Sequence, residues 1–155
     1  RGDRSIAWTN EEITAENRSF LRGLRDGIDL ELGDLAVALV HGSPRRVNEY
    51  LYEDRPDASL ERLLDLAEAD VLVCGHTHLP YHRTPPSGRH VVNAGSVGKP
   101  KDGDPRACYV VLSAEGEAFD AEFVRVAYDV EATAAAIEAS GMPSAFAAML
   151  RAGEG

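Results

Sequence analysis

The sequence contains little cysteine. Cys74 and Cys108 are the only two in 155 residues, and each lies in an apolar stretch typical of a strand. Domains that depend on disulfides carry a denser and more regular set of cysteines. The sequence therefore excludes a disulfide framework and predicts two buried thiols in a reducing, cytoplasmic environment.

Positive charge and long apolar runs are also scarce. Lys and Arg number 16 against 26 Asp and Glu, which gives a formal net charge of -10. We therefore expect no broad basic face for nucleic acid, and an anionic substrate would need local positive charge such as metal ions. No apolar run approaches the roughly 18 residues that cross a bilayer, so we expect no membrane association. Oligomeric state has no signature in the sequence.

The composition, with 44% hydrophobic and 27% charged residues, is that of a globular chain. No linker or repeat divides it, so residues 1–155 are interpreted as one domain. Near the start, Thr14 is a plausible N-cap for a helix over residues 15–24 that Gly23 and Gly27 end. Residues 35–40 are almost continuously apolar, which predicts a strand buried on both faces.

A strand, a helix and a second strand follow one another in the middle of the chain. An amphipathic helix is predicted between residues 58 and 69, after the start signals Pro56 and Asp57, and a buried strand at residues 71–74. Such a unit makes its two strands parallel and probable neighbours, with their carboxyl ends at the same edge of the sheet. Open α/β sheets usually build their sites at that edge.

The last part of the chain is predicted to contain strands followed by helices. Strands over residues 89–93, 106–113 and 118–128 are expected to form an antiparallel second sheet. Asp129 is predicted to cap a helix over residues 130–139, and Pro143 to open a short helix that ends at residue 150. The fold class is therefore α/β.

Three histidines follow the two predicted parallel strands. His41 comes directly after residues 35–40, whereas His76 and His78 come after residues 71–74. Neutral imidazole is a common ligand of Zn, Mn, Fe, Ni and Co. Gly75 is expected to let the backbone bend so that the histidines share one cavity. The placement predicts a metal site.

Three motifs in order carry a specific resemblance. They are His-Gly-Ser-Pro at 41–44, Gly-His-Thr-His at 75–78 and Asn-Ala-Gly-Ser-Val-Gly at 93–98. Together they resemble the late motifs of calcineurin-like metallophosphoesterases, whose signature Gly-His-x-His the second one reproduces. The third differs from the family's Asn-Pro-Gly-Ser at Ala94.

The resemblance implies a sandwich of two mixed β-sheets flanked by helices, with two divalent metal ions (Mn, Fe, Zn, Ni or Co) at the strand ends. His41 and His76 would bind the second metal and His78 the first. The implied activity is hydrolysis of a phosphomonoester or phosphodiester by a metal-bound hydroxide. Arg45 and Arg46 could bind the substrate phosphate, and an exposed helix start is the alternative for them.

Other polar residues near the motifs receive structural roles. Ser43 is assigned to a turn, because the sequence supports no Ser-His-Asp arrangement around it. Residues 93–98 are expected to pack beneath the Gly-His-Thr-His loop, with Gly95 and Gly98 allowing a tight backbone. His82 and His90 are interpreted as surface residues or as residues that support the ligands.

The family's early motifs, an Asp-x-His pair, a Gly-Asp and a Gly-Asn-His/x-Asp segment, are absent from this sequence. We therefore expect a partial domain that lacks its N-terminal part and is inactive alone, because three neutral imidazoles cannot offset the repulsion between two cations. Residues 1–4 resemble the flanks of the Gly-Asn-x-Asp-Arg segment. The alternatives are a non-catalytic, degenerate binding module and an unrelated protein with a structural zinc site.

Overall fold

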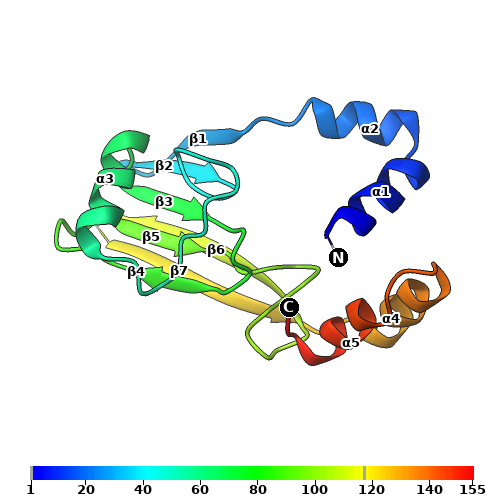
Figure 1. The fold of residues 1–155 in the computed structure, drawn as a ribbon. Helices are drawn as coiled ribbons and strands as arrows, with labels where there is room; N and C mark the ends of the chain where they lie inside the picture. The colour runs from blue at the N-terminus through cyan, green and yellow to red at the C-terminus, as the bar shows by residue number, and fades with distance from the viewer. Residues whose placement is uncertain (1, 117) are drawn as a thin grey trace.

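The computed structural model describes residues 2–116 and 118–155, apart from the side chains of residues 2 and 3. Seven strands and five helices follow in the order shown in Figure 1: α1 (Gly2–Glu12), α2 (Ala15–Arg22), β1 (Gly27–Leu32), β2 (Leu35–Val40), α3 (Asp57–Ala67), β3 (Val71–Cys74), β4 (Tyr81–Arg83), β5 (His90–Asn93), β6 (Ala107–Glu115), β7 (Ala118–Val126), α4 (Val130–Ala139) and α5 (Ala145–Ala152). The molecule is an α/β protein.

A mixed five-stranded sheet with the order β1-β2-β3-β5-β4 forms the centre of the fold. β2, β3 and β5 are parallel, while β1 and β4 pair antiparallel at the two edges. The parallel pairing of β2 with β3 across α3 confirms the predicted strand-helix-strand unit. The carboxyl ends of β2 and β3 therefore lie at one edge, directly before His41 and Gly75.

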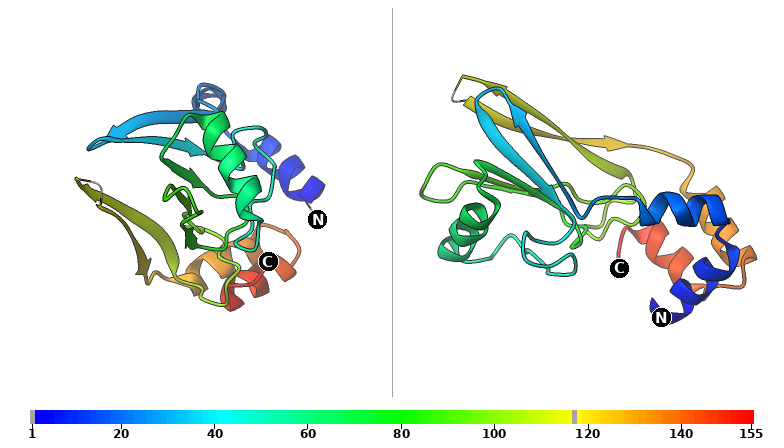
Figure 2. Two further views of the ribbon diagram at one scale, coloured as in Figure 1. Left: turned by 90° about the vertical axis from the view of Figure 1, so that its left-hand side faces the viewer. Right: turned by 90° about the horizontal axis from the view of Figure 1, so that it is seen from above.

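The sheet is covered on both faces. Figure 2 shows α3 on one side and the β6–β7 hairpin on the other. Towards α3, the buried leucines Leu60, Leu63 and Leu64 pack on Leu72 and Val91. Towards the hairpin, Val37, Val71 and Val73 contact Leu112 and Phe119. Alternate residues of one strand thus reach different layers, which explains why β2 and β3 are apolar throughout.

The second layer differs from the predicted one. Only β6 and β7 pair there, and they pair antiparallel, so this layer is a hairpin rather than a mixed sheet in the described part of the chain. The strand predicted at residues 89–93 was assigned to the wrong layer, because β5 runs parallel to β3 in the central sheet. A strand's pairing partner is a long-range property that its own sequence does not contain.

The predicted helix caps are confirmed. The Thr14 side chain accepts a hydrogen bond from the Asn17 amide, and that of Asp129 accepts one from the Ala132 amide. α2 ends at Gly23 as expected, but it buries no residue: Phe20 is 67% exposed. α1, β1 and β4 are additional elements that the sequence analysis did not predict. None of the helices among the described residues is long and apolar enough to cross a membrane.

Candidate metal centre

Two of the three predicted histidines meet at the carboxyl edge of the sheet. His41 Nε2 and His76 Nδ1 are 3.1 Å apart, and the ring planes are inclined at 66°. The neighbouring strands β2 and β3 bring them together, and the Gly75 amide donates to the His41 carbonyl at 2.8 Å. The two nitrogens are within hydrogen-bond distance, and the tautomer of each ring decides which of them donates.

The backbone of the Gly-His-Thr-His loop is bent at the histidines themselves. His76 and His78 have φ angles of 63° and 62°, whereas Gly75 is not among the residues with positive φ. The Thr77 amide donates to the Gly75 carbonyl at 2.7 Å, which makes a tight turn centred on His76. The expectation that Gly75 provides the bend was therefore wrong. Positive φ costs a residue with a side chain about 1–3 kcal/mol, and such strain clusters at functional sites.

His78 is oriented by a partner far along the chain. Its Nδ1 lies 2.6 Å from the Lys99 carbonyl oxygen, so Nδ1 carries the hydrogen and donates it. This contact leaves Nε2 as the nitrogen with a free lone pair. Metal-binding histidines commonly donate their other N–H to a carbonyl in this way. Sequence reasoning missed Lys99, because any residue type can supply a backbone carbonyl.

Burial favours the neutral form of two of these rings. Partial desolvation, followed by the neighbouring His41 and Lys101, lowers the pKa of His76 below its ordinary value. Desolvation also lowers the pKa of His78, although the hydrogen bond with the Lys99 carbonyl opposes the effect. A neutral imidazole is the form that binds a metal ion.

A buried amide supports the loop from beneath. Asn93 is fully buried, and its Nδ2 donates to the Gly75 carbonyl and to Thr77 Oγ1, both at 2.9 Å. Its Oδ1 accepts from the Gly95 amide at 3.0 Å. Gly95 has a φ of 72° and packs against Cys108, so a side chain there would be strained. The predicted supporting role of residues 93–98 thus holds for Asn93 and Gly95.

The loop after β2 has its own polar framework. Ser43 Oγ donates to Glu49 at 2.5 Å and accepts from the amides of Arg45 and Arg46 at 3.1 Å, which makes it a turn residue as predicted. A Cβ on Gly42 would lie 2.6 Å from the Val47 carbonyl oxygen. The backbone therefore needs glycine at this position.

The two arginines after this motif have different partners. The Arg45 guanidinium pairs with Glu49. No side-chain hydrogen bond or ion pair involves the Arg46 guanidinium among the described residues, and this side chain is exposed. The segment forms turns, so the alternative of a helix start is wrong. Both arginines and Asn48 line a hollow of about 370 Å³, and the Asn48 backbone is hydrogen-bonded to His76.

The donor set fits one divalent ion between His41 and His76. Two nitrogens bound at about 2.1 Å to one ion lie about 3.0–3.4 Å apart for octahedral to tetrahedral angles. The observed 3.1 Å lies in this range. Among the described side chains, however, no group of three His, Cys, Asp or Glu could hold a metal ion. His78 is accordingly not a third ligand of that same ion.

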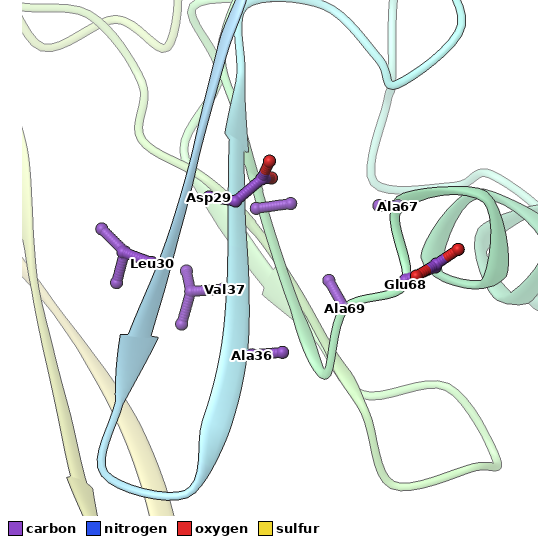
Figure 3. Close-up of a pocket in the computed structure, with 8 residues that line it drawn as sticks. Asp29, Leu30, Ala36, Val37, Ala67, Glu68 and Ala69 are labelled. Atoms are coloured by element: carbon purple, nitrogen blue, oxygen red, sulfur yellow. The ribbon is translucent and has the colours of Figure 1, made fainter.

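Two other features lie away from this edge. His82 and His90 form a second pair, with Nε2 and Nδ1 3.0 Å apart, beneath the ring of Phe119. Figure 3 shows residues that line a hollow between β2 and the segment that follows α3, among them Asp29, Ala36 and Ala69. The volume of this hollow is about 260 Å³. Leu30 and Val37 project to the other side of the strands. This hollow contains no imidazole or guanidinium.

The chain is thus an α/β protein with two histidines close together at the carboxyl edge of its parallel strands. The family model described as "Calcineurin-like phosphoesterase superfamily domain" matches residues 6–117. The chain belongs to this superfamily.

Three proteins are similar to this chain in sequence or in structure. An uncharacterized protein from Methanocaldococcus jannaschii is 28% identical over 143 residues, covering 82% of this chain and 56% of its own length. A metallophosphoesterase from Sphaerobacter thermophilus has a TM-score of 0.77 at 27% identity, covering 95% of this chain and 65% of its own. A hypothetical protein from Pyrococcus horikoshii has a TM-score of 0.78 at 24% identity, covering 90% and 55%. The chain therefore spans less than two thirds of each relative.

Proposed function

We propose that the whole protein is a metal-dependent phosphoesterase that hydrolyses a phosphomonoester or phosphodiester. The observation that carries the proposal is the 3.1 Å approach of His41 Nε2 to His76 Nδ1 at the carboxyl edge of β2 and β3. Membership of the calcineurin-like phosphoesterase superfamily supports the same chemistry. Two divalent ions bound there, among which Mn, Fe, Zn, Ni and Co suit imidazole, would polarise the phosphoryl group and activate water.

Each protein group has a defined task in this proposal. His41 and His76 would hold one ion, and His78, whose Nδ1 donates to the Lys99 carbonyl, would offer its Nε2 to the other. Asn93 keeps the loop between the two histidines in its strained shape. Since the described side chains offer no group of three ligands, the remaining ligands of the two ions would come from other parts of the whole protein.

Arg46 is the better candidate for the substrate phosphate. A guanidinium binds phosphate through two parallel hydrogen bonds, which requires that its N–H groups are free. Glu49 occupies those of Arg45, and this interaction also raises the pKa of Arg45 above its ordinary value. The exposed Arg46 side chain adjoins the same hollow. In this proposal Arg45 stabilises the loop through Glu49, and Arg46 binds the substrate phosphate.

The test is metal content together with hydrolysis of bis(p-nitrophenyl) phosphate and p-nitrophenyl phosphate. The full-length gene product and residues 1–155 are each stripped with a chelator and then supplied with Mn. We expect turnover by the full-length product that disappears on chelation and returns with Mn. A full-length product that binds no metal and turns over neither ester would contradict the proposal and favour a non-catalytic binding module.

A further inference from the structure

Two exposed tyrosines form a stacked pair next to His76. The Tyr50 and Tyr52 ring centroids are 5.7 Å apart with planes only 6° from parallel, and each side chain is 46% exposed. The Tyr50 ring also lies 4.2 Å from the His76 ring, centroid to centroid. A stacked aromatic pair beside a candidate ligand offers a flat apolar face on which a planar group can stack.

The residue between the tyrosines explains why both rings project together. Leu51 is fully buried, and its carbonyl accepts a hydrogen bond from the Tyr81 hydroxyl at 2.9 Å. The residues on either side of Leu51 are exposed, so the chain alternates between solvent and core here. Anchoring Leu51 in the core therefore turns Tyr50 and Tyr52 outward side by side. The pair is held in place before any ligand arrives.

A hollow continues from the tyrosines. It has a volume of about 560 Å³ and is lined by Tyr52, Glu53, Asp54, Leu79 and Arg83. Leu79 follows His78 directly in the chain. The hollow is linked to the candidate metal centre by ring contacts, because Tyr52 lines it and stacks on Tyr50, whose ring lies against His76. It is shallow and open to solvent over most of its extent.

The charges of the hollow select a neutral, hydrogen-bonding group. The guanidinium of Arg83 is occupied, since it donates to the Glu53 carbonyl and pairs with Asp57. Neither the Glu53 nor the Asp54 carboxylate has a hydrogen bond or ion pair within residues 2–116 and 118–155. Free carboxylates repel a phosphate but accept hydrogen bonds from hydroxyl and amino groups. A ligand here therefore presents an aromatic face and hydrogen-bond donors, without negative charge of its own.

We propose that the Tyr50–Tyr52 pair and its hollow bind the nucleoside part of a nucleoside phosphoester. The base stacks on the exposed tyrosine face, and sugar hydroxyls or base amino groups donate to Glu53 and Asp54. The single phosphate extends past Tyr50 to the histidine pair. This inference rests on the proposed function for its phosphate end, whereas the nucleoside end depends on the tyrosines alone.

The test begins with neutral probes and no added metal. Adenosine and ribose are titrated against the full-length gene product by NMR or calorimetry. We expect adenosine to bind at the tyrosines and ribose to bind far more weakly. Stacking a base on an aromatic ring is worth about a fivefold to hundredfold change in affinity. Equal binding of adenosine and ribose, or none of either, would overturn the proposal.

Variants identify the ring that binds. Tyr52→Leu is expected to weaken adenosine binding at least fivefold, while Tyr52→Phe retains it because the ring remains. Tyr109→Leu is the matched control: Tyr109 is also 46% exposed, but it lies on β6. An equal loss in Tyr109→Leu and Tyr52→Leu would contradict the assignment. Because both tyrosines are exposed, thermal melting should show that the variants fold.

The two proposals can fail separately. If adenosine binds through Tyr52 but no phosphoester is hydrolysed with Mn, the nucleoside site stands and the proposed function fails. If aryl phosphoesters are hydrolysed but adenosine does not bind, and Tyr52→Leu leaves the KM for AMP unchanged, the phosphoesterase stands and the nucleoside site fails.

Discussion

The molecule contains two histidine pairs with almost the same internal geometry in very different surroundings. His41 and His76 approach to 3.1 Å, and His82 and His90 to 3.0 Å, in each case between an Nε2 and an Nδ1. The first pair lies at the carboxyl edge of parallel strands, with an exposed ring on His41. The second lies on β4 and at the start of β5, facing the hairpin.

Their surroundings decide what each pair can do. The Phe119 ring lies 4.4 Å from that of His90 and 5.5 Å from that of His82, so the second pair is part of the packing between sheet and hairpin. The first pair is held by strained backbone at His76 and has an arginine-lined hollow beside it. A short nitrogen-nitrogen distance alone therefore does not identify a metal site. The open edge and the preformed loop distinguish the first pair.

The largest expected effect comes from removing one imidazole of the first pair. His76→Asn keeps a residue that tolerates positive φ, so the loop can retain its shape. We expect the affinity for Mn or Zn to fall at least a hundredfold, because one of two ligands from this chain is lost. Calorimetric titration measures the affinity. His90→Asn, which breaks the second pair, should change the metal affinity less than twofold. Equal losses of affinity in both variants would contradict the distinction between the two histidine pairs.

Only the first pair of this contrast could be predicted from the sequence, since His82 and His90 were interpreted as surface residues or as residues that support the ligands, whereas they pair with each other against Phe119. The continuous apolar runs at 35–40 and 71–74 identified β2 and β3, and their parallel order brought His41 and His76 to one edge. The alternation in β1, Gly-Ile-Asp-Leu-Glu-Leu, is a strand signal in the sequence, although no strand was predicted there. β4 has three residues, too few for a periodic pattern.

Other features depend on contacts distant in sequence. The pairing of His82 with His90 needs the register of β4 on β5, and the orientation of His78 needs the Lys99 carbonyl. The left-handed backbone of His76 and His78 had no signal in residue types, since glycine is the residue usually expected there. Sequence could place the ligands but not their orientation.

The second-largest effect is expected at Asn93, whose side-chain amide lies beneath the first histidine pair. Asn93→Leu removes one donor each from the Gly75 carbonyl and the Thr77 hydroxyl, which keep the Thr77 and Leu79 amides as donors, and it leaves the Gly95 amide without its acceptor. We expect a loss of about 2–4 kcal/mol in unfolding free energy and about a 10- to 100-fold loss in metal affinity. Urea denaturation and metal titration measure these quantities. Unchanged metal affinity in a folded variant would show that the loop keeps its shape unaided.

Substitution of Arg45 and Arg46 tests which of the two arginines binds the substrate phosphate. Arg46→Ala should raise the KM for a phosphoester about tenfold, since one charge-assisted contact to phosphate is lost. Arg45→Ala should change KM less than threefold, because its guanidinium is already paired with Glu49. Steady-state kinetics of the Mn-loaded full-length product provides both values. A larger KM effect in Arg45→Ala would reverse the assignment.

The smallest effect depends on pH. The hydrogen bond from Arg45, together with those from Ser43 and Arg55, lowers the pKa of Glu49 from 4.5 to about 2. Since the folded-state pKa lies below the unfolded value, the carboxylate stabilises the fold above about pH 4.5, and this stabilisation is lost as the pH falls through about 2.

Glu49→Gln should therefore reduce the free energy of unfolding by about 1 kcal/mol at pH 7, after allowance for solvent screening. The difference from the parent should disappear as the pH approaches 2. Urea denaturation across this range measures it, with the exposed Glu122→Gln as the control. A stability difference that persists unchanged at pH 2 would rule out the Glu49 charge as its cause.

The central proposal is that the first histidine pair holds a metal ion and the second does not. X-ray diffraction at the Mn absorption edge, on crystals of the full-length protein grown with Mn, tests it most directly. The account predicts an anomalous peak within bonding distance of both His41 Nε2 and His76 Nδ1, and none beside His82 and His90. A peak at the second pair with none at the first would contradict it.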